Sequence, residues 1–347
     1  MKTGFFSKMV IILTLTVFMS VSAGADPSIN PKDVKPFTWK LASLAPKYVG
    51  WAKHIRELIH PAVARASEGK LIPKWYWGGI MGEDRDYIDK MKIGQLDGAA
   101  FNGQGVVLAM PEMAVLELPF MFNNYAEVDY VRKKMFIKFD ALARKRGYII
   151  VAWADQDFDQ IYSTKYPLTT VEEFKKTKFL SWYGPAEEKV LKRLGTSPIP
   201  IGVLEISPSI RQNVADTLIA PAVWIVGSQL YTTIKYVNPV KIRYSPVALF
   251  VRLEVWNKLP DQYQRDLLAI RNHEVIEFTE LARNDSGRSL EAMIKRGGVK
   301  ESVMPPAEIE KMKALLKPVW YEMAGKDFSR ELLDELLGHL ETFRANE

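Results

Sequence analysis

Hydrophobic and polar positions follow two alternating periods along the chain. Apolar residues recur at every second position in "FTWKLAS" from Phe37 and in "LIPKWYW" from Leu71, which predicts two strands. Between them, the apolar residues of 51–66 fall on one helical face, and Pro61 is expected to kink that helix. The run "YIIVAW" at 148–153 predicts a buried strand. Such regular exchange of strand and helix patterns predicts an α/β fold with a mainly parallel sheet.

The second half of the chain also alternates between strand and helix patterns. "FLSWYG" predicts a strand that turns at Gly184, and "PAEEKVLKRLG" predicts a helix that starts at Pro185. "VKIRYSPVALFVRLEVWNKLP" predicts two extended pieces. The pattern of 260–297 is helical throughout, and a helix of about 30 residues spans about 45 Å. A helix of that length is expected to bridge two domains.

The first residues form a segment of their own. Lys2 and Lys8 precede an apolar run at 9–19, and small residues follow up to Ala25. This is the three-part pattern of a secretory signal peptide. The apolar run is too short for a membrane span, which needs about 20 residues. We therefore expect a cleaved signal peptide, rather than an anchor, and a periplasmic mature protein.

The patterns together predict a domain organisation. A chain of 347 residues is long enough for two domains of ordinary size. We expect a signal peptide at 1–25, a first α/β domain at 26–155 completed by about 246–290, a second α/β domain at 156–245, a long domain-spanning helix at 260–297, and C-terminal helices at 298–347.

Composition excludes several classes of function. The chain has no cysteine, so disulfides, thiolate metal sites, thiol nucleophiles and a lipid anchor on cysteine are all excluded. The formal charge of +6 is scattered among acids, which argues against nucleic-acid binding. The four histidines (His54, His60, His273, His339) lack metal-ligand spacing, and no dinucleotide or nucleophile motif is present. Glu187 and Glu188 are expected on a solvated helix face. We expect no cofactor, no metal and no enzymatic activity.

Aromatic residues are the more informative signal. Several lie in or at the ends of predicted strands: Trp75, Trp77, Trp153, Trp182, Tyr183 and Trp224. Any one of them is explained well by core packing. Open α/β sheets, however, bind ligands at the carboxyl ends of their strands, so several aromatic rings at such ends favour a ligand site.

The order of several motifs resembles one family. "LASLAP", "GEDRDYIDKMKIGQLDGAA", "PEMAVLELPFMF", "RGYIIVAWADQDF", "FKKTKFLSWYG" and "IRQNVADTLIAP" follow one another between about Phe37 and about Gly297. The chain resembles the dicarboxylate-binding (DctP-like) solute-binding proteins of tripartite ATP-independent periplasmic (TRAP) transporters. The resemblance implies a two-domain periplasmic binding protein fold, a ligand cleft between the domains and integral membrane transporter subunits as partners. It implies no catalysis.

Two positions depart from the family pattern. Members usually carry an arginine that grips a substrate carboxylate on the first strand of the second domain, where this chain has Leu180. Further on, Ile219 and Ala220 replace an expected polar pair. Without these anchors a buried carboxylate costs several kcal/mol. We therefore expect a hydrophobic or aromatic organic ligand.

The expected binding residues follow from these departures. Leu180, Trp182, Tyr183, Ile219, Pro221 and Trp224 should form an apolar mouth, and Asn102, Gln156 and Asp157 could orient a ligand by hydrogen bonds. Asn102 is equally well explained as a turn residue beside Gly103. For Gln156 and Asp157 a surface loop is the favoured alternative.

Two other functions remain open on the sequence. The ligand could be an organic anion held by a relocated cation, for which Lys47 and Arg211 are the candidates. The protein could instead sense a ligand for a signalling or lipid-trafficking partner. Transport of an apolar, aromatic or long-chain compound is the hypothesis that the sequence favours.

Overall fold

The computed structural model describes residues 35–48 and 50–346. The predicted signal peptide at 1–25 lies outside the described residues. Within these two ranges, no helix combines the length and the apolar character that a membrane span requires. The described residues belong to one compact unit. The domain boundaries expected from the sequence stay a prediction.

A mixed sheet forms the centre of the molecule. In the described part of the chain it has seven strands in the order β2-β1-β3-β8-β4-β7, with β9 beside β8. The strands are β1 (Phe37–Ser43), β2 (Leu71–Trp77), β3 (Gly98–Asn102), β4 (Tyr148–Ser163), β7 (Thr217–Ala220), β8 (Tyr236–Arg252) and β9 (Lys300–Glu301). β1 is parallel to β2 and β3, but β8 is antiparallel to β3 and β4, and β4 is antiparallel to β7. The expectation of a mainly parallel sheet therefore holds for β1 to β3 and for the short pair of β8 with β9, but not for the two long central strands.

The two central strands are longer than their hydrophobic patterns suggest. β4 continues ten residues past Trp153, and the segment expected as two extended pieces is the single strand β8. Polar residues do not end β4, because neighbouring elements supply buried partners for them, as described below. The register between β4 and β8 shifts between Asp155 and Asp157, where the strand bulges.

The first region of the chain carries short helices. They are α1 (Gly50–His54), a π-helical turn (Ile55–Ile59), α2 (His60–Ala66), α3 (Asp84–Lys92), α4 (Gln104–Ala109) and a 3-10 segment (Pro111–Glu117). The N–H of His60 donates to the carbonyl of Ile55, five residues earlier. This π turn directly precedes Pro61, which lacks the N–H that a regular helix would use. The helix is therefore interrupted near the predicted kink.

A second set of short elements follows β4. They are a 3-10 turn (Val171–Lys176), β5 (Leu180–Ser181), α6 (Pro185–Arg193), β6 (Ile199–Pro200), a 3-10 turn (Val203–Glu205), α7 (Ile206–Arg211), α8 (Ala222–Gly227) and a 3-10 turn (Leu230–Thr232). β5 is parallel to β6, and a bridge from Phe179 to Thr217 links this pair to β7. We call residues 37–122 the first lobe and residues 164–235 the second lobe.

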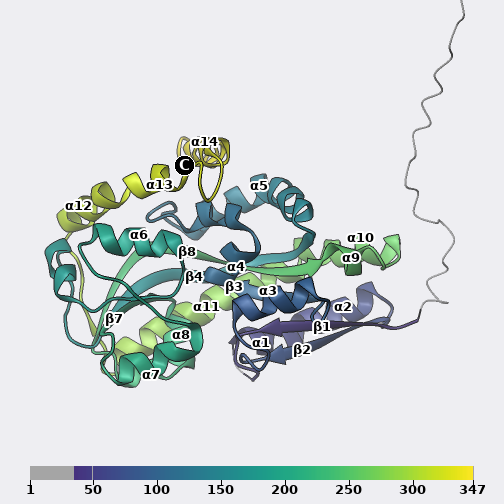
Figure 1. Cartoon of the computed structure of the whole chain (residues 1–347), viewed down its shortest axis with the longest axis horizontal. Coiled ribbons are helices and arrows are strands. Elements are labelled where there is room, and N and C mark those ends of the chain that lie inside the picture. The colour runs from purple at the N-terminus through teal and green to yellow at the C-terminus, as the bar shows by residue number, and fades with distance from the viewer. Residues whose placement is uncertain (1–34, 49, 347) are drawn as a thin grey trace, which may run out of the picture. The chain divides into compact units, whose positions relative to one another are not determined.

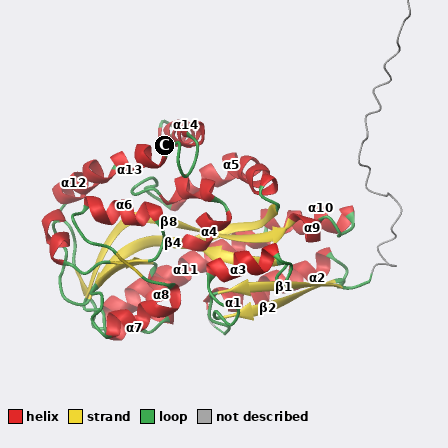
Figure 2. Ribbon diagram, viewed as in Figure 1, coloured by secondary structure: helices red, strands yellow, loops and turns green. Residues whose placement is uncertain are grey.

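The remaining helices lie outside the two lobes in the sequence. They are α5 (Tyr125–Lys145), α9 (Leu253–Trp256), α10 (Asp261–Ala269), α11 (Glu274–Lys295), α12 (Pro306–Leu316), α13 (Pro318–Met323) and α14 (Arg330–Arg344). A 3-10 turn at Ile270–Asn272 separates α10 from α11, so the single helix expected at 260–297 is two helices. α11 contacts α1 of the first lobe and α8 of the second (Figure 1). The C-terminal helices lie beside α5 and α6 (Figure 2).

Candidate functional site

A cleft of about 640 Å³ lies between the two lobes. On the first lobe it is lined by the loop after β1, by Trp51 at the start of α1 and by Asn102 at the end of β3. On the second lobe it is lined by Val203 and by the α8 segment 223–229. Gln156 of β4 also lines it. β1 and β3 both end at the cleft, as expected for a ligand site in a sheet of this kind.

One face of α11 forms the polar wall of the cleft. Its residues are Asp285, Arg288, Ser289, Ala292 and Arg296. The others lie three, four, seven and eleven residues after Asp285, so they share one side of the helix and of its C-cap, Arg296. The Nε2–H of His54 on α1 donates to Asp285 at 2.7 Å, and Arg288 pairs with the same carboxylate at 2.5 Å. Burial opposes the charge of Asp285, but hydrogen bonds from His54 and Arg288 lower its pKa.

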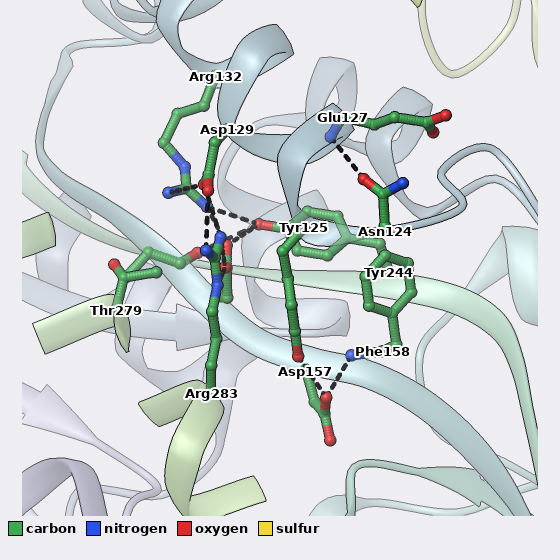
Figure 3. A network of polar contacts seen from close by, with 12 residues as sticks. Asn124, Tyr125, Glu127, Asp129, Arg132, Asp157, Phe158, Tyr244, Thr279 and Arg283 are labelled. Atoms are coloured by element: carbon green, nitrogen blue, oxygen red, sulfur yellow. Dashed lines mark hydrogen bonds and ion pairs between the residues drawn. The ribbon is translucent and has the colours of Figure 1, made fainter. Parts of the chain in front are cut away.

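An ion-pair network fixes α11 against α5 and β4 (Figure 3). Arg283 donates to Asp129 of α5 at 2.8 and 2.6 Å and to Asp155 of β4 at 2.6 Å. Arg132 of α5 pairs with the same two carboxylates. The two cations and two anions neutralise one another, so this network positions α11 rather than offering a free charge.

A second contact continues the network toward the cleft. The hydroxyl of Tyr125 donates to Asp157 at 2.6 Å (Figure 3). The hydroxyl of Ser286 on α11 donates to the same carboxylate. Burial raises the pKa of Asp157 to about 6, although these hydrogen bonds oppose the shift. Asp157 is therefore committed to α5 and α11 and does not line the cleft.

A stack of aromatic rings leads inward from the cleft. The rings of Trp224 and Trp182 are 5.1 Å apart, and those of Trp182 and Tyr183 are 4.2 Å apart. The indole N–H of Trp182 donates to the carbonyl of Ile219 at 2.8 Å, and the hydroxyl of Tyr183 donates to Gln156 at 3.3 Å. Of these rings only Trp224 lines the cleft.

Tyr183 closes the inner end of the stack against the first lobe. A Cβ atom at Gly103 would lie 2.4 Å from the ring of Tyr183, and Gly103 has φ +48°. Only glycine combines that conformation with so close an approach. A residue of the second lobe therefore rests on the backbone that follows β3.

The position where the family arginine was expected lies in the core. Leu180 is fully buried and belongs to the second lobe's hydrophobic cluster. The nearby guanidinium is that of Arg243 on β8, 3.5 Å from the ring centroid of Tyr183. Arg243 donates to Asp159 at 3.0 and 2.6 Å, and Glu187 lies 3.8 Å away. This cation is neutralised by its own carboxylates and does not line the cleft.

Glu117 completes a buried acidic cluster around Arg243. It is 1% exposed, and neither of its carboxyl oxygens has a hydrogen-bond partner in the described structure. Burial raises its pKa to about 8; Arg243 opposes the shift, whereas the charges of Asp159 and Glu187 add to it. Glu117 therefore holds a proton at neutral pH. Glu187 is also buried, contrary to the expectation of a solvated helix face, because its carboxylate caps the backbone N–H groups of Trp182 and Tyr183.

The structure brings together only part of the predicted site. Asn102, Gln156 and Trp224 line one cleft. Gln156 and Asp157 lie on a buried strand, not on a surface loop. Trp182 and Tyr183 lie behind Trp224, whereas Leu180, Ile219 and Pro221 are buried beneath the cleft wall. Lys47 and Arg211 are exposed and do not line the cleft, and Arg211 instead donates to the carbonyl of Gln229.

Several cleft residues were not anticipated. Trp51 and the polar face of α11 are the main ones. The signal for that face was present in the sequence, since Asp285, Ser289 and Arg296 share a helical side, but a stripe of polar residues usually faces solvent. Over the described ranges, no cluster of three or more metal-ligating side chains is placed to hold an ion.

Comparison with known proteins agrees with this architecture. A cleft between two lobes is typical of a protein that binds a small solute. The model of the bacterial extracellular solute-binding protein family 7 (DctP) matches residues 45–327, and the chain belongs to this family.

Relatives of known structure share the fold at low identity. The sugar acid binding protein DctPAm of Advenella mimigardefordensis, in complex with galactonate, has a TM-score of 0.80 at 18% identity, covering 89% of this chain and 99% of that one. A TRAP periplasmic solute-binding protein of Desulfovibrio salexigens with bound orotic acid has a TM-score of 0.81 at 17% identity, covering 88% and 99%.

A solute-binding protein of Chromohalobacter salexigens is 26% identical over 213 residues, 60% of this chain and 62% of the relative. The match thus spans less than two thirds of that relative.

Proposed function

We propose that this protein is the periplasmic solute-binding component of a TRAP-type transporter, and that it captures an organic molecule with a large apolar or aromatic part. Membership of the DctP family supports the transport role. The ligand is held in the cleft between the lobes and delivered to integral membrane subunits.

The cleft wall is the observation that carries the choice of ligand. Trp51 and Trp224 face the cleft from different lobes, and Leu44, Val203 and Val223 add aliphatic surface. Asn102 and Gln156 supply neutral hydrogen-bonding groups. Burial of about 200 Å² of apolar ligand surface contributes roughly 5 kcal/mol before entropic costs. Micromolar binding corresponds to about 8 kcal/mol, so the remainder has to come from further apolar burial and from these hydrogen bonds.

The first experiment identifies the ligand and tests its place. Native mass spectrometry of protein purified without denaturation should reveal a co-purifying apolar or aromatic molecule. Trp224→Ala should reduce its retention about tenfold or more, because the ring forms a wall of the cleft. Tyr321→Ala is the matched control, since Tyr321 is an exposed ring on α13 that does not line the cleft. A hydrophilic co-purifying solute would overturn the choice of ligand.

Organic-anion binding is the second candidate, and the arginines of α11 favour it. Arg288 and Arg296 both line the cleft, and Arg296 makes no ion pair within the described residues. The relocated cation would thus come from α11, not from Lys47 or Arg211. The galactonate and orotic acid complexes of similar structures agree with an acidic ligand. Loss of binding in Arg296→Gln, together with a strong dependence of affinity on salt, would favour this candidate.

A further inference from the structure

A second, apolar cavity lies where the first lobe packs against the central strands and against α10 and α11. Its volume is about 90 Å³, and it lies between the sheet and the helices α2, α10 and α11. Val151, Ala152 and Leu249 line it from the two central strands, yet each is only half-buried. Side chains in the middle of a sheet covered by helices normally touch other atoms on all sides. These side chains instead face empty space.

Three side chains that line the cavity have ring nitrogens without a hydrogen-bond partner in the described structure. They are Trp39, Trp75 and His60, and each of these nitrogens is buried. Burial lowers the pKa of His60, and the charge of Arg56 adds to that effect, so its ring is neutral at neutral pH. The cavity is therefore uncharged, and a bound chain there meets only apolar surface and neutral rings.

A small hollow adjoins both this cavity and the cleft, and we call it the neck. Its volume is about 20 Å³, and it shares four lining residues with each neighbour. Those shared with the apolar cavity are Ile55, Ala100, Val247 and Phe278. Those shared with the cleft are Leu44, Ala45, Trp51 and Asn102. Cleft, neck and cavity are thus neighbours, and the volume of the neck would hold about one water molecule.

The wall of the neck includes an irregular helical turn. Ile55 belongs to the π-helical turn before Pro61, where the regular helical hydrogen bonds are interrupted. Such turns occur often at functional positions.

We propose that the ligand is an amphiphile with an unbranched apolar tail, whose head stays in the cleft and whose tail passes through the neck into the apolar cavity. This inference rests on the proposed function and names its ligand class. The head meets Asn102, Gln156 and the polar face of α11, while the tail fills the apolar cavity. A branched or wide molecule does not pass the neck, so selectivity comes from shape at this point.

Chain length is the direct test. Delipidated protein is titrated calorimetrically with butanoate, octanoate and dodecanoate, and with dodecanol to ask whether a carboxylate is needed. Each methylene that enters the cavity should tighten binding roughly fourfold until the tail fills the space. Dodecanoate should therefore bind at least about 100-fold more tightly than butanoate. Equal affinity along the series overturns the inference.

A cavity-filling variant separates the tail site from the cleft. Ala152→Leu should leave butanoate affinity unchanged and weaken dodecanoate at least about tenfold. Ala141→Leu is the matched control, because Ala141 is exposed on α5. Ala100→Leu, in the neck, should also weaken dodecanoate binding. It serves as a second variant if Ala152→Leu folds poorly. Thermal melting shows whether each variant is folded. Equal dodecanoate affinity in wild type and in both folded variants overturns the inference.

The proposed function fails in a different way. If the protein binds no compound of the series at any chain length, and no apolar molecule co-purifies with it, the apolar cleft ligand is wrong. If compact aromatic compounds bind in a Trp224-dependent manner without any effect of chain length or of Ala152→Leu, the proposed function stands and the tail site is wrong.

Discussion

The cleft and the central strands of this protein use charge in opposite ways. The cleft is walled by tryptophans, aliphatic side chains and neutral amides, and its charged residues, Asp285, Arg288 and Arg296, are confined to α11 and its C-cap. The buried stretch of β4 and β8 is instead dense in charge, with Asp155 and Asp159 each paired to arginine. Ionic bonds thus hold the central strands together. Outside α11 the cleft wall is mainly apolar or neutral, which is the basis of our proposal that recognition relies on apolar surface.

Breaking the buried ionic cluster should have the largest effect. Arg243→Met leaves Asp159 and Glu187 without their cation in the interior, so the free energy of unfolding should fall by about 3–5 kcal/mol. Denaturant unfolding measures it. Arg211→Met, on the exposed surface, should stay within about 0.5 kcal/mol of wild type. An equally small change at Arg243 would contradict the structural role of the cluster.

Glu117 should give the next largest effect, and that effect depends on pH. Its folded pKa of about 8 lies above the ordinary value of 4.5. Between these values the folded state holds a proton that the unfolded state has lost, so this contribution to stability is greatest below about pH 4.5 and is lost as the pH rises to about 8. Glu117→Gln stays neutral at every pH.

The variant should therefore match wild type near pH 4.5 and exceed its free energy of unfolding by about 2–4 kcal/mol near pH 9. Urea titrations at several pH values measure the difference. If the free energies of unfolding of the two proteins change with pH in parallel, Glu117 does not hold a proton in the folded state.

Breaking the ion pairs that fix α11 should lower the free energy of unfolding by less. Arg283→Gln removes the bonds to Asp129 and Asp155, but Arg132 still pairs with both carboxylates, so we expect a loss of about 1–2 kcal/mol. Arg330→Gln, which breaks an exposed pair with Asp334, should change stability by less than about 0.5 kcal/mol. If the two variants unfold alike, the network in Figure 3 does not fix α11.

The exposed cations should have the smallest effect on recognition. Lys47→Gln and Arg211→Gln remove charges that the structure places outside the cleft. Octanoate affinity by calorimetry should change less than about twofold in either variant, since exposed charges at this distance are screened. A large loss of octanoate affinity would show that these residues belong to the binding site and that recognition depends on charge.

Much of the fold followed from local patterns. The strand at Phe37 and the helix that starts at Pro185 were confirmed, because alternation and helical spacing reflect which face is buried. β4 was predicted too short because Gln156 and Asp157 looked like loop residues. Their burial depends on partners from α5, the second lobe and α11, which no local pattern contains.

The sequence by itself determined the family, the α/β character and the absence of an arginine at Leu180, since each depends on residue identity and order. Only the tertiary structure decided which side chains meet in the cleft, because Asn102, Trp224 and Arg296 come from distant parts of the chain. It also decided that Glu187 is buried and that a hollow lies behind the cleft. Contacts between distant segments set the burial of each group and the space left beside it, and neither quantity is encoded in local spacing.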